Sequence, residues 1–487
     1  MKKLFVLALG SLLINGCMYG VVNDASTGSA IATASVKVIN GNCSGVGCGS
    51  WPYTELTQTS GLYVFDAYGD TNGTSNVKLI TPSSGQEAIT LQISKPGYIT
   101  RTIYHKPKYE KVTNNGKTYY VTAAPQVYLC PIGSLDSDGD SICNDAESRY
   151  GTNMFNSDTD GDSISDAAEL FGSEGVDLRY YGADPRRKNL FVEADYYPGL
   201  KPAQAAIDQV IQAFADAPVS NPDGSTGITL AIDLDDQIAA ADVDNDLNPA
   251  WTDFDVIKNA YFPTRRAKTF HYALFANRYN GGSSSGLSRG IPAHDFIVSL
   301  GAWPTPGGTV AQQAGTLMHE FGHNLGLRHG GHENQNRKLN YLSVMSYDYQ
   351  MPGLHFDGVN GVLDYSRLKI NAIGSTTSEF SAMSGYGGTT ETDLAKYRVR
   401  KGGVLLTGTA SSNLDINNNG VLQSSVATTA ASASQNDWDN IVFSGGGSGG
   451  NIGDDLLGIQ AMFKSATLLY KQVPDYMTEQ CMTPDDL

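Results

Sequence analysis

The sequence predicts a multidomain fold in which an N-terminal β-sandwich, an acidic connector and a C-terminal α/β domain follow one another. The chain has 487 residues, which is more than one hydrophobic core usually organises. Short alternating strands fill its first part, whereas strand-like and helix-like segments alternate in its last part. An acidic pattern that occurs twice separates the two. We expect a leader at 1–16, the sandwich at 17–130, the connector at 131–187 and the α/β domain at 188–487.

The charge balance limits the classes of partner. The chain carries 50 acidic and 33 basic residues, which give a formal net charge of −17. Because an excess of negative charge is repelled by phosphates, nucleic acid and anionic membrane surfaces are excluded as electrostatic partners. The sequence does not predict an oligomeric state.

The N-terminus predicts export. Lys2 and Lys3 precede an apolar run at 4–13, which is typical of a signal peptide and is shorter than the roughly 20 apolar residues of a membrane-spanning helix. The run ends in Ile-Asn-Gly-Cys at 14–17 and resembles a bacterial lipobox. This resemblance implies acylation of Cys17 and a lipid membrane anchor in the bacterial cell envelope, at the outer membrane or cell surface. The alternative is ordinary cleavage, which would leave a thiol at position 17 and a secreted protein.

The cysteines fit an oxidising compartment. Cys43 with Cys48 and Cys130 with Cys143 are the nearest pairs in sequence, and Cys481 is left over. Sequence alone does not fix the connectivity of the disulfides.

The first strands predict a small sandwich. Runs at 34–39, 61–65 and 88–93 alternate between apolar and polar residues and are separated by Gly, Asn, Ser and Pro. The phrases at 20–24 and 95–98 resemble the carboxypeptidase regulatory-like, transthyretin-like domain. The resemblance implies a non-catalytic spacer or adhesion module, and an unrelated sandwich would have the same role.

The connector contains two related twelve-residue loops, at 136–147 and 158–169. Oxygen donors recur at positions 1, 3, 5, 9 and 12 of each loop, and a backbone carbonyl is available at position 7. Calcium prefers six to eight oxygen ligands, so a structural Ca²⁺ site is predicted in each loop. The predicted ligands are Asp136, Asp138, Asp140, Ile142, Asn144 and Glu147 in the first loop, and Asp158, Asp160, Asp162, Ile164, Asp166 and Glu169 in the second.

In both loops glycine falls at position 4 and not at position 6. The loops therefore resemble thrombospondin type 3 repeats more than EF-hands, which implies a stiffening role. The alternative is an acidic, solvated linker that binds no ion.

The last part of the chain has an α/β order. Strands are predicted at 189–195, 227–233, 269–275 and 295–300, and an amphipathic helix at 202–217. Further on, 415–420 is predicted as a calcium loop or a turn, 444–450 as a mobile loop, and 454–471 as a closing helix.

A dense histidine motif lies in this α/β part. His319, Glu320, His323, Gly326 and His329 match the spacing H-E-x-x-H-x-x-G-x-x-H. Histidines four apart share one face of a helix, because a turn takes about 3.6 residues, and a glycine lets the chain turn so that a third histidine can reach the same ion. Three protein ligands leave a position open for water, which predicts a catalytic Zn²⁺ site. The alternative is a closed structural site or histidines that fill a core.

The same region predicts where the helix begins and which residue acts as the general base. Thr309 is a candidate N-cap with Gln312 in the capping-box position, so the helix should begin there. Glu320 follows a ligand directly, which places it beside the metal as the general base that takes a proton from the attacking water.

The motif identifies the α/β part as similar to the metzincin clan of zinc metalloproteases. The clan resemblance implies a methionine turn below the metal, which Met345 provides in Ser-Val-Met-Ser-Tyr at 343–347. This turn looks like the serralysin and astacin form, which implies that Tyr347 can ligate zinc and stabilise the oxyanion; the alternative is a packed core tyrosine. The segment 295–300 resembles the edge strand that binds extended peptide, or is an ordinary core strand. Gly330 and Gly331 depart from those subfamilies, which place Glu or Pro after the third histidine.

The resemblance implies a zinc-dependent endopeptidase that cuts protein or peptide substrates outside the cytoplasm, with Glu320 and Tyr347 as catalytic residues. One rival is a surface adhesion lipoprotein with a vestigial metal site, which the intact Glu320 and methionine turn disfavour. The other is a zinc hydrolase that acts on amides other than peptide bonds.

Overall fold

The computed structural model describes residues 16–44, 53–66, 79–114, 117–380 and 383–444, together with Met482. They divide into two compact units, with the boundary between Lys188 and Asn189. Several predicted features lie outside the described residues: the apolar run of the signal peptide, Cys48 and Cys481, most of the glycine-rich loop 444–450, and the closing helix 454–471. Cys17 lies in the first strand. Within the described part of the chain, no helix is long and apolar enough to cross a membrane.

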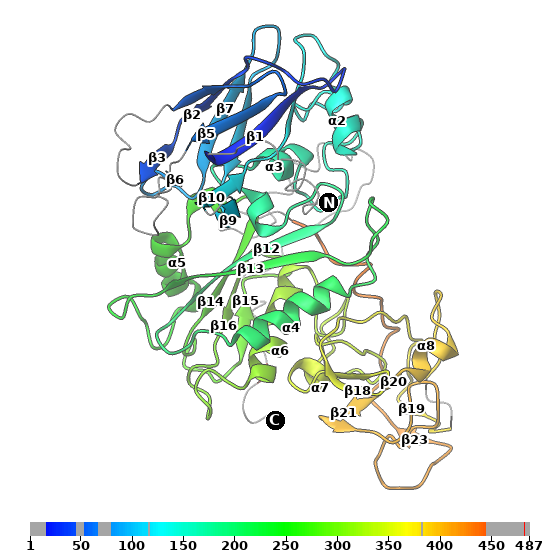
Figure 1. Ribbon diagram of the computed structural model, residues 1–487. Coiled ribbons are helices and arrows are strands. Elements are labelled where there is room, and N and C mark those ends of the chain that lie inside the picture. The colour runs from blue at the N-terminus through cyan, green and yellow to red at the C-terminus, as the bar shows by residue number, and fades with distance from the viewer. Residues whose placement is uncertain are drawn as a thin grey trace, which may run out of the picture. The chain divides into compact units, whose positions relative to one another are not determined.

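The first unit is built from two main sheets and a small third one (Figure 1). The first sheet contains β1 (Gly16–Asp24), β5 (Leu62–Asp66), β9 (Glu110–Asn114), β10 (Lys117–Ala123) and β11 (Val127–Leu129). The second contains β2 (Ser35–Val38), β4 (Thr54–Leu56), β7 (Ile89–Ser94) and β8 (Arg101–His105). The small sheet pairs β3 (Gly41–Ser44) with β6 (Leu79–Pro82). The strands predicted at 34–39, 61–65 and 88–93 are therefore present as β2, β5 and β7.

Buried and exposed residues alternate along these strands, and the buried ones form one shared core. In β2, for example, Val36 and Val38 are buried whereas Lys37 is exposed, because successive side chains point to opposite faces. Phe65 of the first sheet and Leu91 of the second belong to the same buried cluster. The two sheets thus enclose a single hydrophobic core.

The segment that carries the two acidic loops is built onto this core. It contains α2 (Asn144–Tyr150), α3 (Asp166–Phe171) and the short 3₁₀ helix η3 (Leu178–Tyr181). Ile142, Ala146 and Phe171 are buried in the cluster that the sheets form. Both acidic loops are therefore held by the core of the first unit and have no separate core of their own.

The second unit contains a five-stranded sheet in the order β13-β12-β14-β16-β15 (Figure 1). Its strands are β12 (Asn189–Tyr196), β13 (Thr229–Gln237), β14 (Phe270–Phe275), β15 (Gly286–Ser288) and β16 (Asp295–Val298). The first four strands in this order are parallel, and β15 runs antiparallel to β16. The strands predicted at 189–195, 227–233, 269–275 and 295–300 are confirmed.

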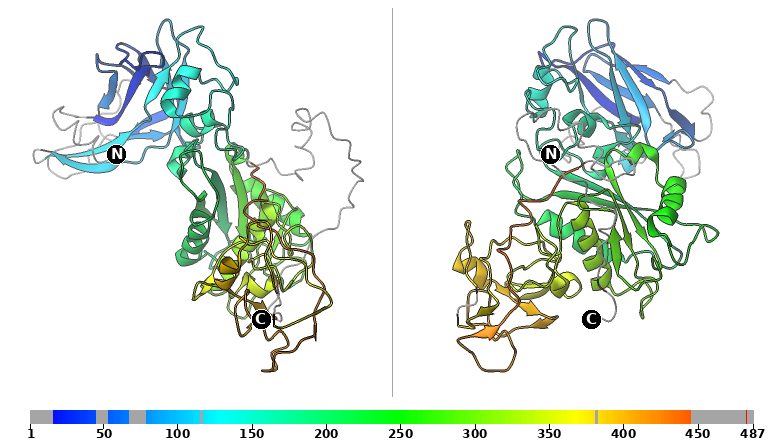
Figure 2. Two further views of the ribbon diagram at one scale, coloured as in Figure 1. Left: turned by 90° about the vertical axis from the view of Figure 1, so that its right-hand side faces the viewer. Right: turned by 180° about the vertical axis from the view of Figure 1, so that it is seen from behind.

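Helices cover both faces of this sheet (Figures 1 and 2). On one face lie α4 (Gln204–Ala215) and α6 (Val310–Asn324), whose apolar residues share a cluster with alternate residues of β12 and β14. On the other face lies α5 (Ala250–Tyr261), where Phe254 contacts Tyr272 of β14 at 5.4 Å between ring centroids. Because β14 points Ala273 and Phe275 to the first face and Tyr272 to the second, the sheet is buried on both sides.

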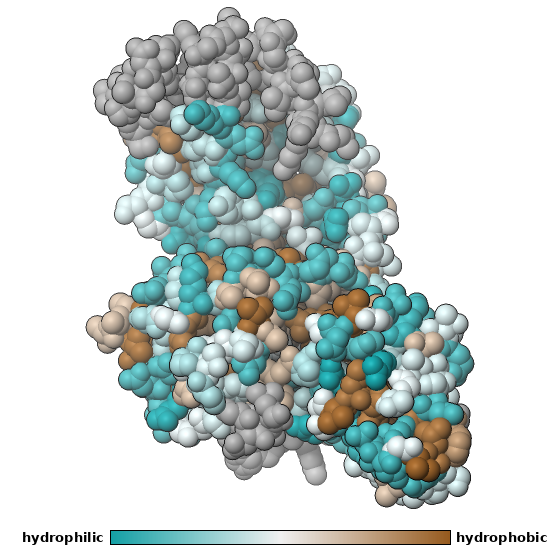
Figure 3. Space-filling view, turned by 60° about the horizontal axis from the view of Figure 1, so that its bottom comes forward, coloured by the Kyte–Doolittle hydropathy of each residue, from teal (hydrophilic) through white to brown (hydrophobic). Residues whose placement is uncertain are grey.

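The other elements of the second unit are short, and all of them except η4 follow α6. They are α7 (Tyr347–Gln350), α8 (Glu391–Ala395), the 3₁₀ turn η4 (Thr264–Arg266, which precedes β14), β17 (Leu354–Phe356), β18 (Val359–Val362), β19 (Thr376–Thr377), β20 (Tyr397–Arg398), β21 (Arg400–Lys401), β22 (Val404–Leu405) and β23 (Val426–Ala427). On the face shown in Figure 3, hydrophobic residues form patches among hydrophilic ones. Exposed apolar residues such as Val359, Phe380 and Val421 are spread along this part of the chain. Scattered residues of this kind are normal for a protein surface.

The sequence left open whether the segment 295–300 is the edge strand or an ordinary core strand. Because β16 lies between β14 and β15, the core-strand alternative is correct. The edge strand is β15, which has only three residues and begins with Gly286. A strand this short shows no alternating pattern, and sequence reasoning therefore missed it.

The disulfide between Cys130 and Cys143 is present, with a sequence separation of 13, and Cys43 is also disulfide-bonded. The first bridge closes a chain segment that includes Asp136, Asp138 and Asp140 of the first acidic loop. It therefore ties that loop to the end of β11.

Replacing both Cys130 and Cys143 by Ala should destabilise the first unit by about 3 kcal/mol, since a cross-link across a loop of this size removes entropy from the unfolded chain. The free energy of unfolding measured by urea titration, followed by circular dichroism, checks this. The single variant Cys130→Ala should lose as much as the double variant, and a double variant as stable as the unaltered protein would contradict the expectation.

Candidate functional site

The histidine motif lies on helix α6 and the turn that follows it. The helix begins with the predicted capping box, in which Thr309 and Gln312 satisfy each other's backbone N–H groups. Its end is fixed by Asn324, whose side-chain amide donates to Ser288 of β15 at 2.7 Å and to the Asp295 carbonyl of β16 at 3.1 Å. Gly326 follows with φ +91°, the left-handed conformation expected from the sequence.

This arrangement brings His319, His323 and His329 together. One ring nitrogen from each lies within 4.8 Å of the others, and all three side chains are buried. The ring centroids are 4.8 Å apart for His319 and His323, 5.2 Å for His319 and His329, and 4.9 Å for His323 and His329. The three imidazoles can therefore hold one metal ion.

Backbone carbonyls orient two of these rings. Nδ1 of His319 lies 2.9 Å from the Val344 oxygen, and Nδ1 of His323 lies 2.7 Å from the Leu327 oxygen. A carbonyl accepts only, so each Nδ1 carries the proton and each Nε2 presents its lone pair. Within the described residues, no group hydrogen-bonds to Nε2 of His319 or His323. Two buried, oriented lone pairs without a partner fit a metal ion.

The electrostatics of the rings also fit a metal. Burial, with a contribution from His329, lowers the pKa of His319 to about 3. Burial and the two neighbouring histidines lower the pKa of His323 well below its usual value. Both rings are therefore neutral at neutral pH, which is the form that binds a metal.

Glu320 is fully buried on the same helix and faces the edge strand. A Cβ added to Gly286 of β15 would lie 2.5 Å from an oxygen of the Glu320 carboxylate. A side chain at position 286 would therefore displace the Glu320 carboxylate from this position. The close approach of β15 to Glu320 is the signal that marks Gly286 as a site residue, and it becomes visible only in the folded structure.

The methionine turn lies directly against the helix. A Cβ at Gly322 would lie 2.3 Å from the Met345 sulfur, so the glycine inside the histidine motif permits this contact. The ring of Tyr347 is half-buried, and its centroid lies 4.8 Å from that of His329 and 5.8 Å from that of His319. Tyr347 thus borders the histidine cluster and is not enclosed in the core.

Asp437 supports the turn from a distant part of the chain, and sequence reasoning missed it. One of its carboxylate oxygens accepts hydrogen bonds from the Tyr341 hydroxyl at 2.7 Å, the Ser343 hydroxyl at 2.8 Å and the Ser366 N–H at 3.0 Å. Burial raises the pKa of Asp437 to about 6, although these donors lower it. The Ser343 oxygen in turn accepts from the Met345 N–H at 3.2 Å.

Two cavities among the described residues of the second unit are relevant to the site. One, of about 300 Å³, is bordered by the start of α6, by Arg337 and Tyr347, and by Met482, whose carbonyl accepts from the Ser285 N–H at 2.6 Å. The other has a volume of about 360 Å³, and none of the three histidines lines either cavity.

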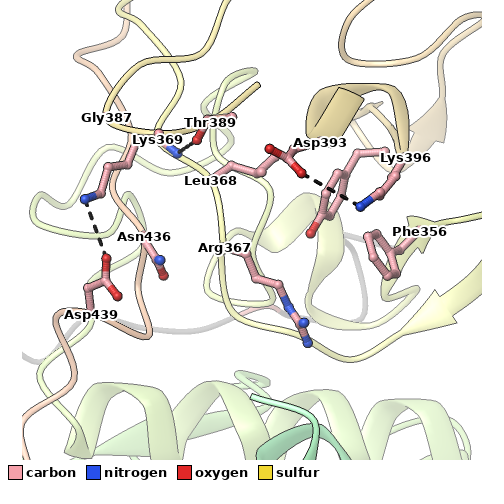
Figure 4. A pocket seen from close by; sticks show the side chains of 12 residues that line it. Phe356, Arg367, Leu368, Lys369, Gly387, Thr389, Asp393, Lys396, Asn436 and Asp439 are labelled. Atoms are coloured by element: carbon pink, nitrogen blue, oxygen red, sulfur yellow. Dashed lines mark hydrogen bonds and ion pairs between the residues drawn. The ribbon is translucent and has the colours of Figure 1, made fainter. Parts of the chain in front are cut away.

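In the larger cavity, drawn in Figure 4, Lys369 pairs with Asp439 at 3.5 Å and Lys396 with Asp393 at 3.8 Å. Its cations are thus balanced by neighbouring acids. Of these two cavities, the smaller is lined by Tyr347, whose ring borders His319 and His329.

The acidic loops of the first unit form two further clusters. Asp136, Asp138 and Asp140 have carboxylate oxygens within 4.8 Å of one another, and so have Asp158, Asp160 and Asp162. Position 6 of each loop, a serine in both, has a positive φ of 75° in the first loop and 71° in the second. The backbone N–H groups of Ile142 and Ile164 donate to Asp140 and Asp162.

Two buried glutamates complete these clusters. Glu147 and Glu169 are fully buried, and no described group hydrogen-bonds to their carboxylate oxygens. Burial and the nearby aspartates raise the pKa of Glu147 to about 7 and that of Glu169 to about 11. Burial and two neighbouring aspartates likewise raise the pKa of Asp160 to about 8. Carboxylates crowded in this way would be stabilised by a bound cation.

The side chain at position 9 of each loop accepts hydrogen bonds from position 2 of the same loop. The Asn144 side-chain oxygen accepts from the Ser137 N–H at 3.0 Å, and Asp166 accepts from the N–H and the hydroxyl of Thr159 at 2.8 Å and 2.7 Å. Both side chains close their loop through hydrogen bonds.

Comparisons with known proteins leave the family open. No family model matches the sequence, and no curated protein matches it. The structure is similar to that of metalloproteinase-II from Bacteroides fragilis over 64% of this chain and 85% of the other, with 13% identity and a TM-score of 0.22. It is similar to that of hydroxyquinol 1,2-dioxygenase from Pseudomonas putida DLL-E4 over 24% of this chain and only 58% of the other, with 14% identity and a TM-score of 0.16. These scores are too low to carry a functional argument, which therefore rests on the geometry of the site.

The buried carboxyl of Asp437 should make the stability of the second unit depend on pH. Because its pKa rises from the usual value near 3.8 to about 6 on folding, its stabilising contribution is complete below about pH 4 and is lost as the pH rises through 6. Relative to the non-titrating variant Asp437→Asn, the free energy of unfolding of the unaltered protein should fall by roughly 3 kcal/mol across this window. Denaturant titrations at a series of pH values measure the difference, and parallel curves would contradict it.

Proposed function

We propose that this protein is a zinc-dependent endopeptidase whose metal is held by His319, His323 and His329. The observation that supports this most is the set of three buried imidazoles, two of which present oriented Nε2 lone pairs with no described hydrogen-bond partner. Neutral imidazole suits zinc, and three protein ligands leave a coordination position open, as catalytic zinc sites do.

Glu320 is the proposed general base. Zinc at this site supplies a Lewis acid that makes water nucleophilic at neutral pH. Glu320 follows a ligand on the helix and is buried next to Gly286, so its carboxylate is shielded from bulk solvent. It accepts a proton from the attacking water and then donates that proton to the nitrogen of the leaving amine.

Tyr347 is the proposed oxyanion stabiliser. Its ring borders His319 and His329 and also lines the smaller cavity. A phenol at this position can donate a hydrogen bond to the substrate oxygen as negative charge develops there.

Extended protein or peptide substrates are the proposed class. Strand β15 is the outermost strand of the sheet on the side of the histidine helix, and its first residue contacts Glu320. An extended peptide can add to such an edge through backbone hydrogen bonds, which places its amide groups near the general base.

The variant Glu320→Gln should lose proteolytic activity by about 100-fold or more, because general acid–base catalysis contributes at least that factor. Cleavage of casein at neutral pH, with zinc content measured for both proteins, checks this. A zinc chelator should abolish the activity of the unaltered protein, and added zinc should restore it.

Equal cleavage by the variant and the unaltered protein would overturn the proposed mechanism. An unaltered protein that binds zinc and cleaves no protein would instead favour an adhesion role or the hydrolysis of other amides.

We also propose that the acidic loops bind two structural calcium ions. The buried oxygens of Glu147 and Glu169 support this, since buried carboxylates without hydrogen-bond partners need a cation to stay ionised. Asp136, Asp138 and Asp140 in the first loop, and the corresponding aspartates of the second, supply further oxygens. The role is structural, because both loops join the core of the first unit.

Export with acylation at Cys17 remains a proposal that rests on the N-terminal sequence pattern. The bridge between Cys130 and Cys143 supports export, because structural disulfides persist in oxidising compartments. Calcium is also plentiful outside the cytoplasm, where weak structural sites can fill.

Removal of calcium should lower the melting temperature of the first unit. At a free calcium concentration about 100 times the Kd, bound calcium stabilises the folded state by about 2.7 kcal/mol per site. Thermal unfolding in excess calcium and in EGTA measures the loss. The variant Glu169→Ala should lose part of this calcium dependence, and a melting temperature that is the same in calcium and in EGTA would rule out the structural role.

A further inference from the structure

The loop after His329 closes on itself directly behind this histidine. The Arg328 N–H donates to the Gly331 carbonyl at 2.8 Å, and the Gly331 N–H donates to the Arg328 carbonyl at 2.9 Å. The Gly330 N–H donates to the Glu333 carbonyl at 2.8 Å. Gly330 and Gly331 are the residues that depart from the serralysin and astacin patterns. In this chain they form backbone hydrogen bonds that close the loop.

Lys338 fills the inside of this loop. Its side chain has no exposed surface. Its ammonium lies 2.7 Å from a Glu333 carboxylate oxygen, 3.1 Å from the Ser432 hydroxyl and 3.4 Å from the Gly330 carbonyl. The Tyr341 ring centroid lies 5.9 Å from the same nitrogen, so a π-face also contacts the cation. All three donor positions of the ammonium are therefore used.

The loop backbone and the stem of Lys338 together leave no room for a side chain at position 330, next to His329. A Cβ at Gly330 would lie 3.0 Å from Cδ of Lys338 and 2.6 Å from the Gln335 carbonyl oxygen. Any side chain at position 330 would therefore force the lysine stem or the loop backbone to move. The closed loop and the buried position of Lys338 together require a glycine at position 330.

A distant segment completes the enclosure. Ser432 also donates to Glu333, the Gln335 side-chain amide donates to the Ala430 carbonyl at 2.7 Å, and the Asn340 side-chain amide donates to the Ser432 carbonyl at 2.8 Å. The loop is thus fixed from both sides, and its ionic centre is Lys338.

We propose that Lys338 is a positioning residue for the metal site, which holds the loop of His329 so that the third imidazole is in place before the metal binds. The inference rests on the proposed zinc site. An outer group that orients a ligand typically changes metal affinity by about 10- to 100-fold when it is removed. Lys338 acts through the Gly330 carbonyl, which belongs to the residue after His329.

The variant Lys338→Met keeps the length of the side chain and removes its charge and donors. Both it and the unaltered sequence are compared in the Glu320→Gln background, so that no proteolysis interferes. We expect zinc affinity, measured by competition with a chromophoric chelator, to fall by at least about tenfold. The visible spectrum of the cobalt-substituted protein should also change, because the geometry at the third ligand is altered.

Lys258→Met is the matched control. Lys258 is also buried and ion-paired, 2.5 Å from Asp295, but it lies on α5 across the sheet from α6. Its loss should lower the melting temperature and leave zinc affinity and the cobalt spectrum unchanged. Ser432→Ala, which removes one contact of the ammonium, provides a milder variant in case Lys338→Met does not fold, and it should weaken zinc binding by a smaller factor.

The outcomes separate the two proposals. Unchanged zinc affinity in both Lys338→Met and Ser432→Ala would overturn the positioning role and leave the zinc site standing. An equal loss in Lys258→Met would also overturn it, because general destabilisation would then account for the effect. Absence of zinc binding in the unaltered protein would overturn both proposals.

Discussion

The second unit depends on the close contact between helix α6 and the turn at 343–347. Gly322 allows this contact, since any Cβ there would collide with the Met345 sulfur. The same approach brings the Val344 carbonyl to His319 and sets Tyr347 beside His329. A larger residue at position 322 would push the turn away from the helix. It would disturb the orientation of His319, the packing of Met345 and the position of Tyr347 at the same time.

Buried ionisable groups fix the position of both sides of this contact. Asp437 accepts hydrogen bonds from the hydroxyls of Tyr341 and Ser343 at the turn, and Lys338 fills the inside of the loop that follows His329. Isolated buried charges are costly, but each of these has several partners with good geometry. Each also joins segments that are far apart in sequence. The chain thus uses buried ionisable side chains to fix the position of neutral groups, such as the hydroxyls of Tyr341 and Ser343 and the carbonyl of Gly330.

The two kinds of candidate metal site respond to burial in opposite ways. Burial lowers the pKa of His319 and His323, so these rings are neutral and can lie together without a counter-ion. Burial raises the pKa of Glu147 and Glu169, so protons compete with a cation for these carboxylates. The imidazole site can therefore be formed before a metal arrives, whereas the acidic loops gain stability from the ion itself.

The sequence by itself determined the local features of the site. Helix periodicity, the capping box at Thr309 and the turn at Gly326 follow from contacts within a few residues, which is why the histidine cluster was predictable. The tertiary structure alone decided that β15 is the edge strand, that its first glycine touches Glu320, and that Asp437 and Lys338 hold the surrounding turns. Those contacts join residues far apart along the chain, and no spacing within a single segment encodes them.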